Sequence, residues 1–136
     1  MHAYLAPRNA FYDIMCVVTW AVEFTDEFSV WWSGLARAAQ DALGAKVFLL
    51  EWRGPALGFP HSSKVVTSRH PHMRELRIQH RGRPYRILYA FDARRTAILL
   101  LGGDKKGDDR FYDVIVRRAD ALYDAHLLHL REEGLI

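Results

Sequence analysis

The stretch from Met73 to Tyr112 constrains the fold most, because it holds three consecutive segments that read as β-strands. Apolar residues alternate there with arginines, which is the period-two pattern of strands that bury one face. Arg81 and Gly82 leave a two-residue link between the first two segments, so these two are expected to form an antiparallel hairpin. The strands are predicted at 73–80, 84–92 and 97–101.

The phase of this alternation separates buried positions from open ones. Leu76 and Ile78 mark the core side of the first strand, which puts Arg77 on the open face and Arg74 on the core side. In the second strand, Arg86 faces away from the tyrosine and isoleucine beside it. The third strand is almost wholly apolar, as expected for a central strand that is covered on both faces.

The segments before this stretch predict one further strand and two helices. Residues 17–24 alternate with period two, and Thr25 is a good helix N-cap because two acids follow it directly. This first helix is short and ends at Ser33-Gly34. A second helix is predicted at 35–52, and residues 56–71 are expected to be irregular.

The end of the chain predicts a loop and one long helix. Residues 102–107 are rich in glycine and are expected to form the loop. Asp108 and Asp109 are expected to cap the helix, which continues to about Glu133. Its buried face is expected to carry Phe111, Val114, Ile115 and Leu122. The chain suits a single domain, predicted at 17–136 after an N-terminal extension at 1–16.

Positive charge is concentrated in one region of the chain. The formal net charge is +3, but residues 69–95 hold eight arginines and two acids, a local net charge of +6. Focused positive charge attracts phosphate backbones or acidic protein segments.

Other features exclude several classes of protein. The single cysteine excludes an intrachain disulfide and fits a reducing compartment. No apolar run approaches the ~20 residues that cross a bilayer, and the N-terminal residues lack the pattern of a secretory signal. A cytoplasmic protein without membrane contact is therefore expected. The close histidine pairs, 70/72 and 126/129, lack a third ligand, so these side chains are expected at the surface, with no metal and no other cofactor.

The basic and phenolic side chains are the remaining candidates for chemistry. Cleaving RNA without a metal requires loss of the 2′-hydroxyl proton, stabilisation of the extra phosphate charge, and a proton for the leaving oxygen. Arginine supplies bidentate donors for the phosphate, and like charge from arginines is expected to lower the pKa of a nearby lysine or tyrosine. A solvated arginine face, or a patch that binds an acidic partner, explains the same residues, so both interpretations stay open.

The chain resembles the RelE/HigB-type toxins of bacterial toxin–antitoxin systems, in particular their phage-derived, HigB-like branch. The motifs that carry the resemblance are VEFTDEF at 22–28, RGPALG at 53–58, ELR at 75–77, RGRPYRILYAFD at 81–92, AILLLGGDKKGDDRFY at 97–112 and ADALYDAHL at 119–127. The resemblance implies an α+β, RelE-like single domain with an N-terminal strand, an α-hairpin, a three-stranded antiparallel meander and a C-terminal helix.

The resemblance also implies a function and a set of site residues. The function is a type II toxin that acts as a ribosome-dependent mRNA endonuclease and is neutralised by a helix-turn-helix antitoxin, with DNA contacted only through the antitoxin complex. The catalytic positions fall on Arg77, Arg86, Lys106 and Tyr112, where Lys106 replaces an arginine of the family pattern. The RNA-binding surface is expected to extend over Lys64, Arg69, Arg74, Arg83 and Lys105.

Two other functions remain open at this point. One is a non-catalytic module whose basic sheet binds an acidic partner, because no conventional general base is evident in the sequence. The other is a gyrase-directed toxin of the ParE type on the same scaffold. Toxins of that type generally lack the basic catalytic residues, so the presence of these residues here argues against it.

Overall fold

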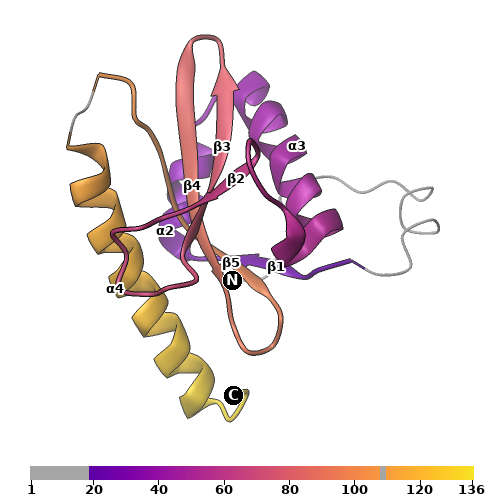
Figure 1. Cartoon of the computed structure of the whole chain (residues 1–136), viewed down its shortest axis with the longest axis vertical. Coiled ribbons are helices and arrows are strands. Elements are labelled where there is room, and N and C mark those ends of the chain that lie inside the picture. The colour runs from indigo at the N-terminus through magenta and orange to yellow at the C-terminus, as the bar shows by residue number, and fades with distance from the viewer. Residues whose placement is uncertain (1–18, 108–109) are drawn as a thin grey trace.

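The computed structural model describes residues 19–107 and 110–136, and it consists of one mixed β-sheet with helices on both faces (Figure 1). The strand order is β1-β5-β4-β3-β2; β1 runs parallel to β5, and every other neighbouring pair is antiparallel. The strands are β1 Val22–Phe24, β2 Ser62–Lys64, β3 Arg74–His80, β4 Arg83–Phe91 and β5 Ala97–Asp104. The helices are α2 Asp26–Ser33, α3 Arg37–Arg53, the 3₁₀ turn η1 Gly54–Ala56 and α4 Phe111–Glu132.

The predicted architecture is confirmed in outline and corrected in its sheet. The N-terminal strand, the two helices, the meander β3-β4-β5 and the C-terminal helix are present, but the sheet has five strands. The additional edge strand, β2, lies within the segment that was expected to be irregular, and its Ser62 pairs with Leu76. Its sequence, SSK, has no apolar alternation, so only its pairing with β3 identifies it as a strand. The expected boundary near residue 17 and the start of the first strand lie outside the described residues.

The hairpin between β3 and β4 turns where the sequence predicts. Both Arg81 and Gly82 have positive φ, 50° and 75°, as the two central residues of a type I′ turn require. This turn sets a register in which Leu76 lies opposite Ile87 and Arg77 lies opposite Arg86.

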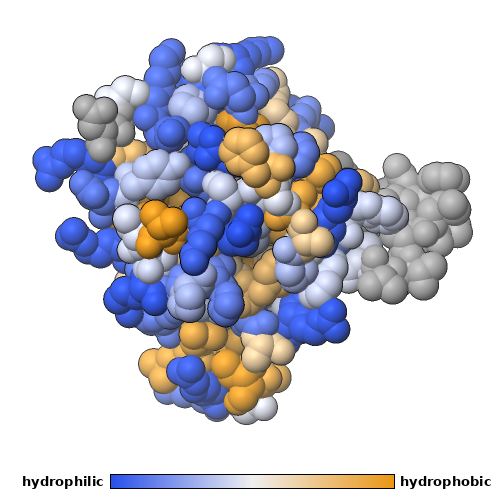
Figure 2. Space-filling model, viewed as in Figure 1, coloured by the Kyte–Doolittle hydropathy of each residue, from blue (hydrophilic) through white to orange (hydrophobic). Residues whose placement is uncertain are grey.

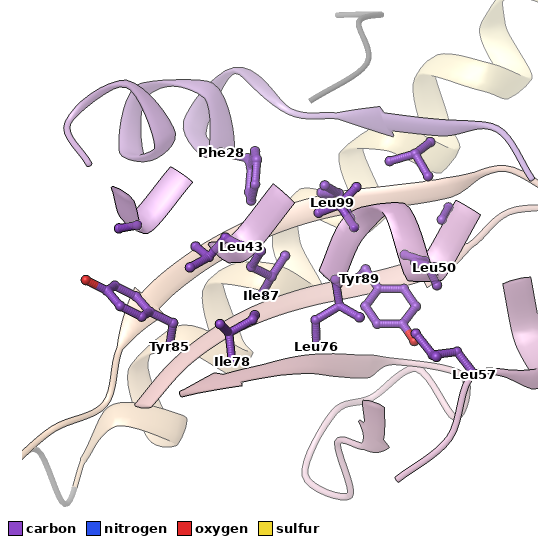
Figure 3. Packing of buried hydrophobic residues seen from close by; sticks show 14 residues of the cluster. Phe28, Leu43, Leu50, Leu57, Leu76, Ile78, Tyr85, Ile87, Tyr89 and Leu99 are labelled. Atoms are coloured by element: carbon purple, nitrogen blue, oxygen red, sulfur yellow. The ribbon is translucent and has the colours of Figure 1, made fainter. Parts of the chain in front are cut away.

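Each face of the sheet buries its own hydrophobic cluster. On one face Leu76 and Ile78 pack with Leu43 and Leu50 of α3, as the phase of β3 predicts (Figure 3). On the other face, residues of β4 and β5 pack against α4. The strands contribute Leu88, Ala90, Ile98 and Leu100, and the helix contributes Ile115, Val116 and Ala119. The third predicted strand is therefore covered on both faces, as expected.

The helix boundaries follow local chemistry with small differences from the prediction. The hydroxyl of Thr25 accepts a hydrogen bond from the Phe28 N–H at 3.0 Å and donates to the Leu100 carbonyl at 2.7 Å, so it both caps α2 and ties it to β5. Helix α3 begins at Arg37, two residues later than predicted. In α4, Val114 is 67% exposed rather than buried, because the sheet-facing side is set by its neighbours Phe111 and Ile115. The expected cap of α4 at residues 108–109 lies outside the described residues.

Apolar residues also gather on the surface near the C-terminus. Figure 2 shows them where α4 ends, and the exposed Leu128, Leu135 and Ile136 belong to this part of the chain. Among residues 19–107 and 110–136, no helix combines the length and apolarity that crossing a membrane requires.

Strand β5 is longer than predicted, because Gly102 and Gly103 continue it instead of opening a loop. A Cβ on Gly102 would overlap the ring of Trp31 from α2, and one on Gly103 would lie 2.8 Å from the ring of Phe111. The glycines are therefore needed for close approach of the two helices to the sheet.

Gly102→Ala is expected to lower the free energy of unfolding by ~1–3 kcal/mol, because the added methyl group has to displace a packed indole ring. Gly44→Ala is the matched control, and it is expected to raise the free energy of unfolding. Its Cβ would meet its nearest neighbour, Trp32, at an ordinary 3.9 Å, and alanine favours the helix by about 1 kcal/mol. Urea unfolding of both variants measures the difference; equal effects would show that β5 does not need a glycine here.

A buried ion-pair network attaches α4 to the sheet. The carboxylate of Asp92 accepts hydrogen bonds from Arg94 at 2.7 Å and from the His126 ring of α4 at 2.9 Å, and Arg94 also binds Glu23 of β1 at 2.9 Å. The expectation of surface histidines is therefore wrong for His126, which is 5% exposed. Burial raises the pKa of Asp92, but the hydrogen bonds from His126 and Arg94 outweigh it and hold the pKa at about 2.

The depressed pKa of Asp92 predicts a loss of stability in acid. A carboxyl group whose pKa is lower in the folded state stabilises the fold above its unfolded pKa of 3.8, and this contribution, ~2 kcal/mol, is lost as the pH falls towards 2. Urea unfolding between pH 2 and 6 is expected to show a shallower pH dependence for Asp92→Asn than for the unsubstituted protein. Parallel curves would contradict this assignment.

Candidate functional site

Three of the predicted catalytic residues meet around one carboxylate that the sequence did not single out. The β3–β4 register puts Arg77 directly across from Arg86, on the face that α4 covers. Glu75 lies on that same face, two residues before Arg77. The first turn of α4 brings Tyr112 to the cluster, and Gly103, opposite Arg86 on β5, allows this approach.

The carboxylate of Glu75 is the centre of these contacts. Its Oε1 accepts a hydrogen bond from the Tyr112 hydroxyl at 2.7 Å and lies 3.6 Å from Nε of Arg86. Its Oε2 accepts from Ser63 at 3.0 Å and from Nη1 of Arg77 at 3.3 Å. A single negative charge therefore holds two guanidinium groups and a phenol in fixed positions.

The two arginines differ in their exposure to solvent. The Arg86 side chain is 6% exposed; its Nη1 donates to the Tyr85 carbonyl at 2.9 Å, and its Nε has no hydrogen-bond acceptor among the described residues. The Arg77 side chain is 30% exposed. Both border a hollow of about 360 Å³. The site thus offers a buried and a half-buried cation to an anion entering from this hollow.

The pKa of Tyr112 is raised, whereas a tyrosine among arginines is expected to have a lowered pKa. Burial raises it, and the hydrogen bond to Glu75 and the charge of that carboxylate raise it further, whereas Arg86 opposes them only in part. Tyr112 therefore keeps its proton at neutral pH, and it is suited to donate a proton rather than to accept one.

The lysines after β5 are placed differently from one another. Lys105 holds its ammonium group 5.5 Å from the centre of the Tyr112 ring, a cation–π contact at the edge of the cluster. Lys106, the predicted catalytic residue, is exposed in the following turn, where its backbone N–H donates to Asp104 at 2.9 Å.

The other predicted RNA-binding residues are spread over the molecule. Arg74 lies on the opposite face from Arg77 and donates to Ser62 at 2.9 Å, consistent with its phase in β3. Arg69 pairs with Asp124 of α4, and Arg83 pairs with Asp104 at 2.7 Å. Lys64 is exposed at the end of β2. Only Lys105 of this set lies beside the cluster.

The site contains residues that the sequence analysis did not select. Glu75 counted there only as an acid that offsets arginines, although its phase in β3 already put it on the face of Arg77. Ser63 and Lys46 come from other elements of the chain than Arg77 and carried no signal of their own, and His61 lies in the segment 56–71, from which only Lys64 and Arg69 were selected. In the described part of the chain, no group of three or more His, Cys, Asp or Glu side chains is placed to hold a metal ion.

The fold is RelE-like, as two solved structures show. The Escherichia coli toxin RelE, a double mutant in the free state, aligns with a TM-score of 0.52 at 14% identity, over 74% of this chain and 98% of that one. A chain of the archaeal RelE–RelB complex from Pyrococcus horikoshii aligns with a TM-score of 0.50 at 15% identity, over 66% of this chain and 99% of that one.

Sequence comparison then defines the family. Residues 30–124 match the family described as "Phage derived protein Gp49-like (DUF891)", and the chain belongs to that family. It is homologous to two Mycobacterium tuberculosis proteins. "Putative toxin HigB2" is 38% identical over 117 residues, which are 85% of this chain and 58% of that protein, so the chain spans little more than half of this relative. "Putative toxin HigB3" is 44% identical over 101 residues, which are 74% of this chain and 87% of that protein.

Proposed function

We propose that the protein is the toxin of a type II toxin–antitoxin pair and that it cleaves mRNA on the ribosome. The observation that carries the proposal is that Arg77 and Arg86 lie opposite one another at one hollow and share the carboxylate of Glu75 with Tyr112, in a chain homologous to two proteins described as putative HigB toxins. The proposed target places the protein in the cytoplasm.

The proposed reaction is an attack by the ribose 2′-oxygen on the neighbouring phosphorus. The 2′-hydroxyl gives up its proton to solvent water, a bond forms from its oxygen to phosphorus, and the bond from phosphorus to the 5′-oxygen breaks. The leaving oxygen takes a proton, so the products are a 2′,3′-cyclic phosphate and a 5′-hydroxyl end. The reaction needs stabilisation of the charge on the phosphate and a donor for the leaving group.

The residues of the cluster fit these requirements. Arg77 and Arg86 are proposed to bind the phosphate, because guanidinium groups present paired donors to phosphate oxygens. Tyr112, whose pKa is raised by burial and by Glu75, is proposed to donate the proton to the leaving oxygen. Glu75 is a positioning residue that orients Tyr112 and Arg77 through hydrogen bonds. Lys105 and Lys106 are proposed to contact the RNA backbone next to the cluster.

The proposed partners are mRNA held on the ribosome and an antitoxin with a helix-turn-helix, through which the pair contacts DNA. The structure of the archaeal RelE relative in complex with RelB supports an antitoxin partner. Ribosome dependence fits a site whose predicted residues include no dedicated general base, since positioning of the substrate then has to supply more of the rate.

Induced expression in bacteria tests the proposal. Growth arrest and new 5′-hydroxyl ends within translated mRNA are expected for the unsubstituted protein, and both are expected to disappear with Arg77→Ala. Co-expression of a cognate antitoxin with a helix-turn-helix is expected to restore growth. Normal growth together with intact transcripts would refute the endonuclease.

A further inference from the structure

A phenylalanine is presented to solvent next to the arginine pair. Phe59 is 76% exposed, and Cζ of Arg77 lies 5.4 Å from the centre of its ring. Exposed single hydrophobic residues are ordinary on protein surfaces, but this one forms part of the wall of the hollow that Arg77 and Arg86 border.

The position of this ring is set by backbone hydrogen bonds. The N–H groups of His61 and Ser62 donate to the Gly58 carbonyl at 3.0 and 3.1 Å, which closes a turn with Phe59 at its tip. The Arg77 N–H then donates to the His61 carbonyl at 2.9 Å and attaches the turn to β3. These bonds hold the backbone that carries the ring, and the ring is part of neither hydrophobic cluster.

Basic side chains form much of the rest of the wall, together with the uncharged Pro60, Ile78 and Gln79. Lys46 of α3 lies 3.0 Å from Nδ1 of His61, and both side chains border the hollow together with the two arginines. None of the eight described residues that line it carries a carboxylate. An aromatic face beside a row of cations is the arrangement with which proteins bind single-stranded RNA, because the ring stacks on a base and the cations bind phosphates.

We infer that Phe59 stacks on a nucleobase of a single RNA strand, adjacent to the phosphate that Arg77 and Arg86 bind, with Lys46 and His61 facing the backbone beyond that base. The assignment of the arginine-bound phosphate as the scissile one rests on the proposed function. The base-stacking subsite itself does not require that any bond be cleaved.

Binding of a non-cleavable oligonucleotide tests the subsite directly. The probe is a fluorescent 2′-O-methyl hexaribonucleotide, whose blocked 2′-oxygens prevent the cleavage reaction, and anisotropy at low salt measures its Kd. Phe59→Ala is expected to weaken binding about ten-fold, within the range of one lost base–aromatic stack, whereas Phe59→Trp is expected to retain it. Val66→Ala, which removes an exposed hydrophobic group elsewhere on the same segment, is the matched control and is expected to bind normally.

An abasic series separates stacking from general attraction. Removing the base at one position of the hexamer is expected to weaken binding to the unsubstituted protein but not to Phe59→Ala. The inference is overturned if the unsubstituted protein and Phe59→Ala bind the intact hexamer with equal affinity. It is also overturned if the unsubstituted protein shows no measurable binding. Normal RNA binding by Phe59→Ala with weakened antitoxin binding also overturns it and assigns the ring to a protein interface. Base-dependent binding without cleavage on ribosomes would refute the proposed function and leave the subsite standing.

Discussion

Replacing Arg86 by glutamine is expected to slow mRNA cleavage by roughly 10²–10³-fold, the usual loss when one donor to a developing negative charge is removed. Glutamine keeps part of the side-chain length and a polar amide with N–H donors, but it loses the Nη1 donor to the Tyr85 carbonyl. The charge is lost, however, so the phosphate keeps only Arg77. The effect is expected in the rate of cleavage at saturating ribosome concentration, measured in single turnover.

The matched control for this substitution is Arg37→Gln on α3. The Arg37 side chain is 86% exposed and, within residues 19–107 and 110–136, forms its ion pair with Asp41 of its own helix, so the control removes one positive charge without touching the cluster. It is expected to cleave at the rate of the unsubstituted protein. A folded Arg86→Gln variant that cleaves as fast as the control would remove Arg86 from the mechanism.

Replacing Glu75 by alanine is expected to lower the free energy of unfolding by ~3–5 kcal/mol, because it leaves Arg86 buried without its counter-charge. Arg77 and Arg86 lie directly opposite one another, so their repulsion is then no longer offset. Glu75→Gln is expected to cost less, since an amide oxygen can still accept from Tyr112. Urea unfolding at low salt measures these differences without screening the charges.

An added anion provides an internal check on this interpretation. Sulfate is expected to restore part of the stability of Glu75→Ala, because an anion bound between the two guanidinium groups stabilises the folded state by mass action. The same sulfate is expected to have a smaller effect on Glu133→Ala, which removes an exposed carboxylate at the end of α4. Full stability of Glu75→Ala at low salt would show that the carboxylate does not hold the arginines together.

The two substitutions probe opposite sides of one arrangement. Arg86→Gln removes a cation that is proposed to bind the substrate phosphate, whereas Glu75→Ala removes the carboxylate that pairs with both arginines in the free protein. In the free protein the carboxylate of Glu75 occupies the position between the guanidinium groups and the phenol. In the proposed reaction, the RNA phosphate is expected to bind the donors of Arg77 and Arg86 that Glu75 leaves available.

Local patterns in the sequence determined the centre of the fold. The period-two alternation of β3 put Leu76 and Ile78 in the core and Arg77 on the other face, and the two-residue link required the hairpin that sets Arg77 opposite Arg86. The cap at Thr25 was equally local. Such features can be read from sequence because each depends on residues within a few positions of one another.

Only the tertiary structure decided the features that depend on distant residues. Pairing with β3 makes a strand of the segment at Ser62, and the approach of Trp31 explains Gly102 within β5. The contact with Glu75 helps to raise the pKa of Tyr112, which neighbouring arginines alone would lower. The same contact is one of those that make Glu75, which the sequence did not single out, the centre of the site. Ser62 and Leu76 are 14 positions apart, and the other two pairs are 37 or more positions apart, so no local pattern could reveal which residues would meet.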